Sequence, residues 1–337
     1  MSKMAIALLT LLVSFFLTAV VRKMAIAKSV MDIPNARSSH TIPTPRGGGV
    51  AIVFAFLAAS VGSYAFGLMH ADMAIGMIVA GAGIALIGFF DDLGHIAARW
   101  RLLGHFCAAA WFVWMLGGMA PITIFGQELA LGLVGSVLAV FYVVWMLNLY
   151  NFMDGIDGLA STEAITACFG MALLSALAGF PQLVTLPLLL AAATAGFLLW
   201  NFPPAKIFMG DAGSGFLGIV LAGLSLQAAW ASSQLFWGWL ILLGVFVVDA
   251  TFTLIRRLLR GDKVYEAHRS HAYQFASRHY GKHLPVTLAV MALNVFWLLP
   301  VALCVVLLGL DGALGLLIAY VPLVLLAVRW RAGELEH

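Results

Sequence analysis

Charged residues are scarce in this chain, since Asp, Glu, Lys and Arg make up only 10% of its 337 residues while hydrophobic residues make up 63%. Soluble globular proteins usually have about 25% charged and about 45–50% apolar residues, so the composition excludes that class. The apolar residues fall into runs of about 17–22, the length with which an α-helix crosses roughly 30 Å of hydrocarbon. Runs of this length also exclude a membrane β-barrel, whose strands are shorter and alternate in polarity.

Cysteines and long polar stretches are also nearly absent. Cys107, Cys168 and Cys304 each lie inside an apolar run, without the paired spacing of a disulfide framework or a metal site, so we expect buried free thiols. No stretch is long enough for a soluble domain, which predicts a single integral-membrane domain over residues 1–334. The first apolar run is too long for a signal peptide, and residues 335–337 resemble the start of a vector-encoded tag.

We predict an all-α polytopic membrane protein with about eleven transmembrane helices, or ten. The spans lie near 4–21, 48–68, 73–90, 102–118, 131–149, 159–179, 184–201, 212–230, 235–255, 286–308 and 313–330. Of the 18 Lys and Arg residues, all except Lys3 lie on one side of the membrane when the gaps between spans are numbered alternately. The positive-inside rule makes that side cytoplasmic, which predicts a periplasmic N-terminus and a cytoplasmic C-terminus.

Acidic residues gather at the cytoplasmic ends of these helices. Asp91 and Asp92 follow the third span directly, where carboxylates are costly unless a cation or hydrogen bonds compensate them. Asn151, Asp154 and Asp157 recur every three residues after the fifth span, so a helical turn or tight loop would put their oxygens on one face. Such oxygen-only groups favour Mg²⁺, because the remaining ligands of a calcium loop are missing. For Asp91 and Asp92, a pair of solvated loop aspartates is the alternative.

Two further clusters face the same side. Asp211 lies in Gly210-Asp-Ala-Gly-Ser-Gly215, at the start of the eighth span, where free N–H groups and the helix dipole would attract phosphate. Such glycines also serve helix packing. His268, Arg269 and His271 stand in the most basic loop and could donate to phosphate oxygens, whereas a zinc site would lack a third ligand. Together the clusters indicate metal-dependent phosphoryl transfer onto a lipid phosphate.

A transporter is the main alternative, because it would also have many spans and a few acids within the membrane. Transporters place their functional polar groups near the bilayer midplane. Here nearly all such groups lie at one face, and Asp249, inside the ninth span, is the main exception; Glu163 remains near the cytoplasmic boundary. The sequence gives neither residue a role. A structural scaffold would leave the acidic clusters unexplained.

Five motifs between about 32 and 275 resemble, in order and spacing, those of the polyprenyl-phosphate N-acetylhexosamine-1-phosphate transferases. That family includes the bacterial UDP-GlcNAc:undecaprenyl-phosphate GlcNAc-1-phosphate transferase and phospho-N-acetylmuramoyl-pentapeptide transferase. The motifs are Asn35-Ala-Arg-Ser-Ser-His40 through Thr44-Pro-Arg-Gly-Gly-Gly49, Asp91-Asp92, Asn151 to Gly158, Phe208 to Gly215, and His268-Arg-Ser-His271. The first is similar to the branch that initiates bacterial O-antigen and capsule-type polysaccharides.

The resemblance implies an enzyme of the bacterial inner membrane with its active site on the cytoplasmic face. It would transfer HexNAc-1-phosphate from a UDP-N-acetylhexosamine to undecaprenyl phosphate, giving undecaprenyl-diphospho-HexNAc and UMP. Mg²⁺ would be the cofactor, and Mn²⁺ could substitute for it. The implied partners are these two substrates and membrane lipid, with no nucleic acid, and small residues in many spans would permit a homodimer.

The resemblance also implies roles for the residues that match the family's motifs. The implied catalytic residues are Asp91, Asp92, His268 and His271. The implied substrate-binding residues are Arg46, Arg101, Asp154, Asp157, Phe208 and Arg269. Asn151 and Asp211 would coordinate Mg²⁺ together with the UDP pyrophosphate. Asp91 would be the base or, in an alternative mechanism, the nucleophile, while Asp157 would hydrogen-bond the uracil and Phe208 would stack on it.

The chain departs from the muramoyl-pentapeptide branch at two places. It has His268-Arg-Ser-His271 where that branch has three consecutive histidines, and His95 where that branch has a lysine. We therefore do not expect a cell-wall precursor enzyme. The sugar stays open among GlcNAc, GalNAc, FucNAc and QuiNAc.

Overall fold

The computed structural model describes residues 3–34, 42–94, 96–263 and 268–335. The motif at Asn35 to His40, His95, and residues 336–337 of the expected tag lie outside these ranges. The described chain is almost entirely helical, which confirms the all-α prediction. Its α-helices are α1 Lys3–Ala27, α2 Gly49–Ala65, α3 Ala71–Gly94, α4 Ala98–Met115, α5 Gly132–Met153, α6 Leu159–Leu177, α7 Thr185–Asn201, α8 Asp211–Ala231, α9 Ser233–Leu242, α10 Gly244–Arg260, α11 Ala272–Tyr280, α12 Leu284–Leu293, α13 Leu299–Leu308 and α14 Gly312–Arg329.

Shorter elements complete the fold. A 3-10 turn η1 (Pro181–Leu183) precedes α7, and a π-helical turn η2 (Asn294–Leu298) joins α12 to α13. Two small antiparallel pairs lie outside the helices, and their strands are β1 Met31–Asp32 with β2 Thr44–Pro45 and β3 Ile122–Ile124 with β4 Gln127–Leu129.

A helix lies at each of the predicted spans, but the count of eleven is not confirmed. Within the described ranges, eight helical segments are long and apolar enough to cross a membrane, or nine if α9 and α10 form one span. Those two helices meet at a bend of 68°. In this count η1 and α7 form one segment, Pro181–Asn201, and α12, η2 and α13 form another, Leu284–Leu308. The apolar α2 is shorter, with 17 residues, and α4 carries Arg99 and Arg101 in its first turn. Both fall outside the count for these reasons.

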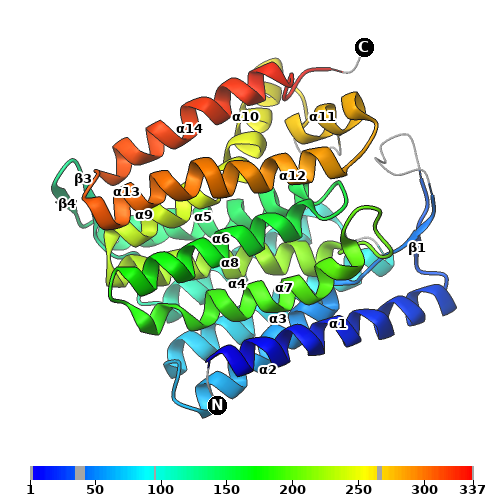
Figure 1. Ribbon diagram of the computed structural model, residues 1–337, viewed down its shortest axis with the longest axis horizontal. Coiled ribbons are helices and arrows are strands. Elements are labelled where there is room, and N and C mark those ends of the chain that lie inside the picture. The colour runs from blue at the N-terminus through cyan, green and yellow to red at the C-terminus, as the bar shows by residue number, and fades with distance from the viewer. Residues whose placement is uncertain (1–2, 35–41, 95, 264–267, 336–337) are drawn as a thin grey trace.

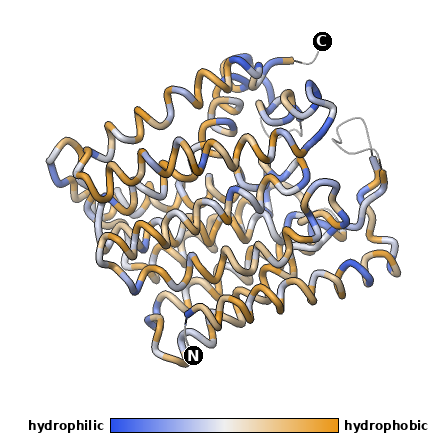
Figure 2. The backbone as a smooth tube through the Cα atoms, in the orientation of Figure 1, coloured by the Kyte–Doolittle hydropathy of each residue, from blue (hydrophilic) through white to orange (hydrophobic). Residues whose placement is uncertain are grey.

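Helix α8 lies at the centre of a bundle whose helices run roughly along one direction (Figure 1). In the stretch of α8 that is long enough to cross a membrane, 94% of the residues are buried. Helix α8 packs against α2, α3 and α5. Hydrophilic residues gather at the end of the bundle that holds β1 and α11 (Figure 2). Helix α8 begins at Asp211, which lies near the polar loops and not among the apolar central segments of the helices.

Glycines let the neighbouring helices approach the start of α8 closely. A Cβ added to Gly49 would lie 2.4 Å from Gly213 Cα, and one added to Gly88 would lie 2.5 Å from the Asp211 backbone. Small residues at helix crossings are the usual way in which membrane helices pack. The contact at Gly88 brings the last turn of α3, with Asp91 and Asp92, beside the first turn of α8.

The cysteine prediction is partly wrong. All three thiols are free, and Cys168 is buried, but Cys107 is exposed and Cys304 is intermediate. Cys107 lies on an outward side of α4, where a membrane protein presents apolar side chains to lipid rather than to its core.

Candidate active site

Two arginines hold three of the predicted carboxylates together. Arg46 Nη2 lies 2.7 Å from Asp92 Oδ1 and 2.6 Å from Asp211 Oδ1. Arg101 Nη1 pairs with Asp91 and lies 3.6 Å from Asp211 Oδ2. The side chains of Asp91 and Asp92 are each 5% exposed, so both carboxylates depend on these partners. The structure thus brings together five residues from four separate segments of the chain.

Backbone hydrogen bonds between two loops place Arg46 beside α8. Phe208 N–H donates to the Pro45 carbonyl at 2.8 Å, and Gly48 N–H donates to the Phe208 carbonyl at 2.9 Å. Burial lowers the pKa of the Arg46 guanidinium, but the charges of Asp211 and Asp92 outweigh that effect, and the pKa is raised. Arg46 therefore stays a cation among the carboxylates.

The carboxylate of Asp92 caps the N-terminus of α8. Its oxygens accept hydrogen bonds from Asp211 N–H at 3.2 Å and from Ala212 N–H at 3.5 Å. The helix dipole favours a negative charge at this position. Gly210, which precedes the helix, has φ +78°, and a Cβ there would lie 2.6 Å from Asp92 Oδ2, so a glycine is needed for this cap. Asp92 thereby orients the start of α8.

Asp91, Arg101, Asn151 and Asp211 line one small cavity. Ser214 Oγ donates to Asn151 Oδ1 at 2.9 Å, which holds the Asn151 amide against the first turn of α8. Asp154 follows α5 directly, and its enclosure by protein raises its pKa well above the ordinary value, although Arg46 acts against that shift. The cavity is therefore surrounded by more carboxyl groups than arginines.

The donor set fits a hard cation such as Mg²⁺. No group of three or more His, Cys, Asp or Glu side chains forms a metal site among the residues that the structure describes. Asn151 and Asp211 supply two oxygens, and Mg²⁺ usually takes few protein ligands and completes its shell with water and substrate phosphates. These two residues could hold the ion.

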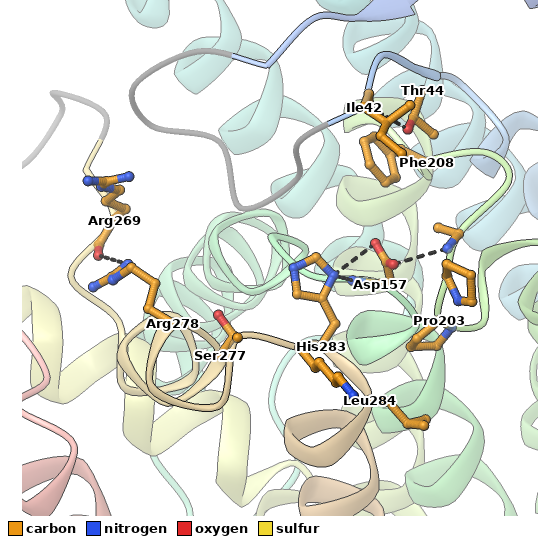
Figure 3. A pocket seen from close by; sticks show the side chains of 14 residues that line it. Ile42, Thr44, Asp157, Pro203, Phe208, Arg269, Ser277, Arg278, His283 and Leu284 are labelled. Carbon is orange, nitrogen blue, oxygen red and sulfur yellow. Dashed lines mark hydrogen bonds and ion pairs between the residues drawn. The ribbon is translucent and has the colours of Figure 1, made fainter.

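A separate pocket of about 660 Å³ lies beside Asp157, in the size range of small-molecule sites (Figure 3). Asp157 Oδ1 lies 3.1 Å from His283 Nδ1, and Asp157 Oδ2 accepts a hydrogen bond from Ala205 N–H at 3.0 Å. Phe208 lines the same pocket. The cationic lining residues are Arg269, Arg278 and Lys282. Three of the predicted substrate-binding residues thus share one pocket whose cations suit an anionic ligand.

The two predicted histidines stand close together before α11. Their ring centroids are 4.9 Å apart. His268 Nδ1 lies 2.9 Å from Ser270 Oγ and accepts from Ser270 N–H at 3.3 Å. Burial lowers the pKa of His268 to about 3, and the charge of Arg257 adds to that effect. His268 is therefore a neutral imidazole with its proton on Nε2 at physiological pH.

His271 is buried and faces Asp249 rather than the acidic cluster at α8. Its Nδ1 lies 3.3 Å from Asp249 Oδ1. Its ring lies 6.4 Å from that of Phe152, which follows Asn151 in the chain. The histidines thus approach Asn151, one of the predicted metal ligands, at the last turn of α5.

Sequence reasoning missed several residues of these sites. The sequence gives only weak signals for four of them. Ser214 lies inside the motif that starts at Gly210, while Arg278, Lys282 and His283 lie in the basic loop before the tenth span. The sequence placed Asp249 inside the membrane but indicated no role for it. Each becomes visible only when helices that are distant in the chain pack together.

The chain is similar to proteins of known families. The model of the family described as Glycosyl transferase family 4 matches residues 73–229. The chain is 32% identical to the probable undecaprenyl-phosphate N-acetylglucosaminyl 1-phosphate transferase of Bacillus subtilis, over 79% of this chain and 75% of that protein. It is 31% identical to the decaprenyl-phosphate N-acetylglucosaminephosphotransferase of Mycobacterium tuberculosis, over 78% and 72% of the two chains. It is 33% identical to a Synechococcus phospho-N-acetylmuramoyl-pentapeptide-transferase, over 67% of each chain.

Proposed function

The chain belongs to the polyprenyl-phosphate N-acetylhexosamine-1-phosphate transferases of glycosyl transferase family 4, and from this we propose that its donor is a UDP-N-acetylhexosamine and its acceptor undecaprenyl phosphate. The observation that supports this most is the cavity lined by Asp91, Arg101, Asn151 and Asp211, together with the larger pocket at Asp157. One site suits a phosphate group with a metal ion, and the other suits a nucleotide.

In the proposed reaction, a phosphate oxygen of the lipid forms a bond to the β-phosphorus of the UDP-sugar. The bond between that phosphorus and the oxygen bridging to the α-phosphate breaks, and UMP leaves with this oxygen. The products are undecaprenyl-diphospho-HexNAc and UMP. Because phosphate monoesters have a second pKa near 6, most of the lipid phosphate is already ionised at neutral pH. Positioning and charge compensation then supply most of the catalysis.

Asp91 would accept any proton that remains on the attacking phosphate. Its carboxylate lies at the cavity and is paired with Arg101, whose guanidinium could also bind a phosphate oxygen. Loss of Asp91 should then slow the reaction rather than abolish it. In the alternative mechanism, Asp91 attacks the phosphorus and forms a covalent intermediate. That mechanism predicts that a variant without Asp91 has no turnover at all.

Asn151 and Asp211 would hold Mg²⁺, or Mn²⁺ in its place. When bound, the ion would neutralise charge on the pyrophosphate as UMP leaves. Asp92 and Arg46 would keep Asp211 in place at the start of α8.

The larger pocket would bind the uridine end of the donor. Asp157, fixed by His283 and Ala205, would accept a hydrogen bond from uracil, and Phe208 would stack on the base. Arg269, Arg278 and Lys282 would attract the pyrophosphate. The acceptor lipid would enter from the inner leaflet of the bacterial inner membrane. The product would begin an O-antigen or a related cell-envelope polysaccharide.

The test is UMP release by the purified protein with undecaprenyl phosphate and Mg²⁺, across a panel of UDP-N-acetylhexosamines. We expect release with at least one donor, and none without lipid or with Asp211→Ala, which removes one proposed metal ligand. The active donor would identify the sugar. Folded protein that releases no UMP with any donor would contradict the proposal and favour a transporter of lipid-linked or nucleotide sugars.

A further inference from the structure

Asp249 is a buried carboxylate to which the proposed reaction gives no role. It lies in α10, and its side chain is 8% exposed. A buried carboxylate is costly unless hydrogen bonds or charges compensate it. Asp249 Oδ1 accepts a hydrogen bond from Ala272 N–H at 2.9 Å, and its Oδ2 accepts one from Tyr273 N–H at 3.0 Å. Asp249 therefore caps the first turn of α11, where the helix dipole favours a negative charge.

The same carboxylate faces the imidazole that precedes this helix. His271 Nδ1 lies 3.3 Å from Asp249 Oδ1, and the His271 side chain is 3% exposed. A carboxylate at one ring nitrogen favours a proton on that nitrogen and fixes the ring orientation. The proton is thus expected on Nδ1, which leaves Nε2 as the nitrogen for a ligand.

The other side of this turn contacts the last turn of α5 and the loop that follows it. Tyr273 Oη donates to the Phe152 carbonyl at 2.9 Å, and the Phe152 and His271 rings stack with an interplanar angle of 27°. A Cβ on Gly155 would lie 2.1 Å from Tyr273 Oη, so the loop backbone approaches as closely as a glycine allows. His271 is held between α10 and the last turn of α5, which contains Asn151.

We propose that Asp249 is a positioning residue that fixes the tautomer and orientation of His271 for contact with the donor sugar. The inference rests on the proposed function, because it takes a nucleotide sugar as the ligand of His271. An imidazole with an unprotonated Nε2 accepts a hydrogen bond from a hydroxyl or an amide N–H, and an N-acetylhexosamine carries both. Asp249 itself does not touch the substrate.

The kinetic test uses Asp249→Asn, which keeps the size of the side chain and one acceptor for α11 but removes the charge. We expect kcat/KM for the UDP-sugar to fall by about 10- to 100-fold, the usual effect of losing a carboxylate that orients a histidine. Asp249→Glu should recover part of the rate. The double variant Asp249→Asn with His271→Ala should be no slower than His271→Ala alone, because Asp249 acts through His271.

Thr253→Val is the matched control. Thr253 Oγ1 donates to Asp249 Oδ1 at 3.3 Å, so this variant removes a hydrogen bond from the same carboxylate without removing its charge, and it should keep the wild-type rate. Independent losses that multiply in the double variant would overturn the inference, as would a loss in Asp249→Asn that only follows a loss of folded protein.

A second readout does not depend on turnover. In ¹⁵N-histidine spectra of the wild-type protein, we expect the His271 signals of an Nδ1–H tautomer, and in Asp249→Asn a shift toward the Nε2–H tautomer. Unchanged signals would contradict the positioning role even if the transferase is active. A third outcome is that the tautomer changes in Asp249→Asn although the wild-type protein releases no UMP. That result would contradict the donor-sugar contact and the proposed function, but not the positioning of His271 by Asp249.

Discussion

At the scale of single residues, the balance of charge around Asp211 decides what the cavity can bind. Arg46 and Arg101 supply two positive charges, while Asp91, Asp92 and Asp211 supply three carboxylates in direct contact with them. Asp154 lies close enough to interact with Arg46. The excess of carboxyl groups favours a divalent cation before an anionic substrate can enter, because a bound ion would reverse the sign of the local charge.

The sequence predicted which residues gather but not how they pair. Asp91 and Asp211 could be assigned to one site, because each lies at a helix end on the same side of the membrane. The pairs Asp157 with His283 and Asp249 with His271 could not be predicted. Their members are 126 and 22 residues apart, and only the packing of α10, α11 and α12 against the loops brings them together.

His268 makes the stability of the protein depend on pH. Its pKa is about 3 in the folded protein because of burial, and about 6.5 is usual in an unfolded chain. Between these values the unfolded state binds a proton that the folded state does not, so stability rises with pH up to about 6.5 and is then constant. We expect the thermal midpoint of the wild type to fall, relative to that of His268→Gln, by roughly 2–3 °C between pH 7.5 and pH 5.

The measurement is thermal unfolding of both proteins in the same detergent across this pH range. The difference between them should stay constant between pH 7.5 and pH 8.5, which serves as the internal control. A difference that stays constant down to pH 5 would show that His268 is not buried as a neutral imidazole.

At the scale of helices, the positions of the elements could be predicted and their irregularities could not. A chain in lipid must satisfy its backbone N–H and C=O groups internally, so each apolar run of sufficient length becomes a helix. At the bend between α9 and α10, Tyr320 Oη donates to the Leu240 carbonyl at 2.7 Å. This bond satisfies a carbonyl in the last turn of α9, and its donor lies 80 residues away in the sequence. Gly244 stands at the break, but the partner Tyr320 could not be predicted from the residues around it.

Two glycines of α3 provide a matched test of helix packing. A Cβ on Gly88 would lie 2.5 Å from the backbone of Asp211, whereas a Cβ on Gly83 would meet nothing within 4 Å. We expect Gly88→Ala to destabilise the protein by about 1–3 kcal/mol. It should also lower transferase activity, because it moves Asp91 and Asp92 away from α8. Gly83→Ala should be neutral or stabilising by about 0.5–1 kcal/mol.

Thermal unfolding and UMP release would be measured for both variants in parallel. If Gly88→Ala matched Gly83→Ala in both assays, the close contact between α3 and α8 would not be needed to assemble the site.

At the scale of the whole molecule, the apolar central segments of the helices separate the two polar ends of the bundle. The hairpin of β3 and β4 lies at one end, while β1 and α11 lie at the other (Figure 1). Lys3, the basic residue assigned to the periplasmic side, donates to the Pro181 carbonyl at 2.6 Å, away from the acidic cluster. The site therefore belongs to the end at which the other basic loops gather.

The predicted orientation can be tested by labelling single cysteines in a protein whose Cys107, Cys168 and Cys304 have been replaced by alanine. Gln127, in the β3–β4 hairpin, and Lys28, after α1, are both exposed. Positive charge resists transfer across the membrane, which predicts that Lys28 lies in the cytoplasm. We expect Gln127→Cys to react with a membrane-impermeant maleimide in intact bacterial cells, and Lys28→Cys to react only after the cells are permeabilised. Labelling of Lys28→Cys in intact cells would put the candidate site on the outer face, where a donor made in the cytoplasm could not reach it.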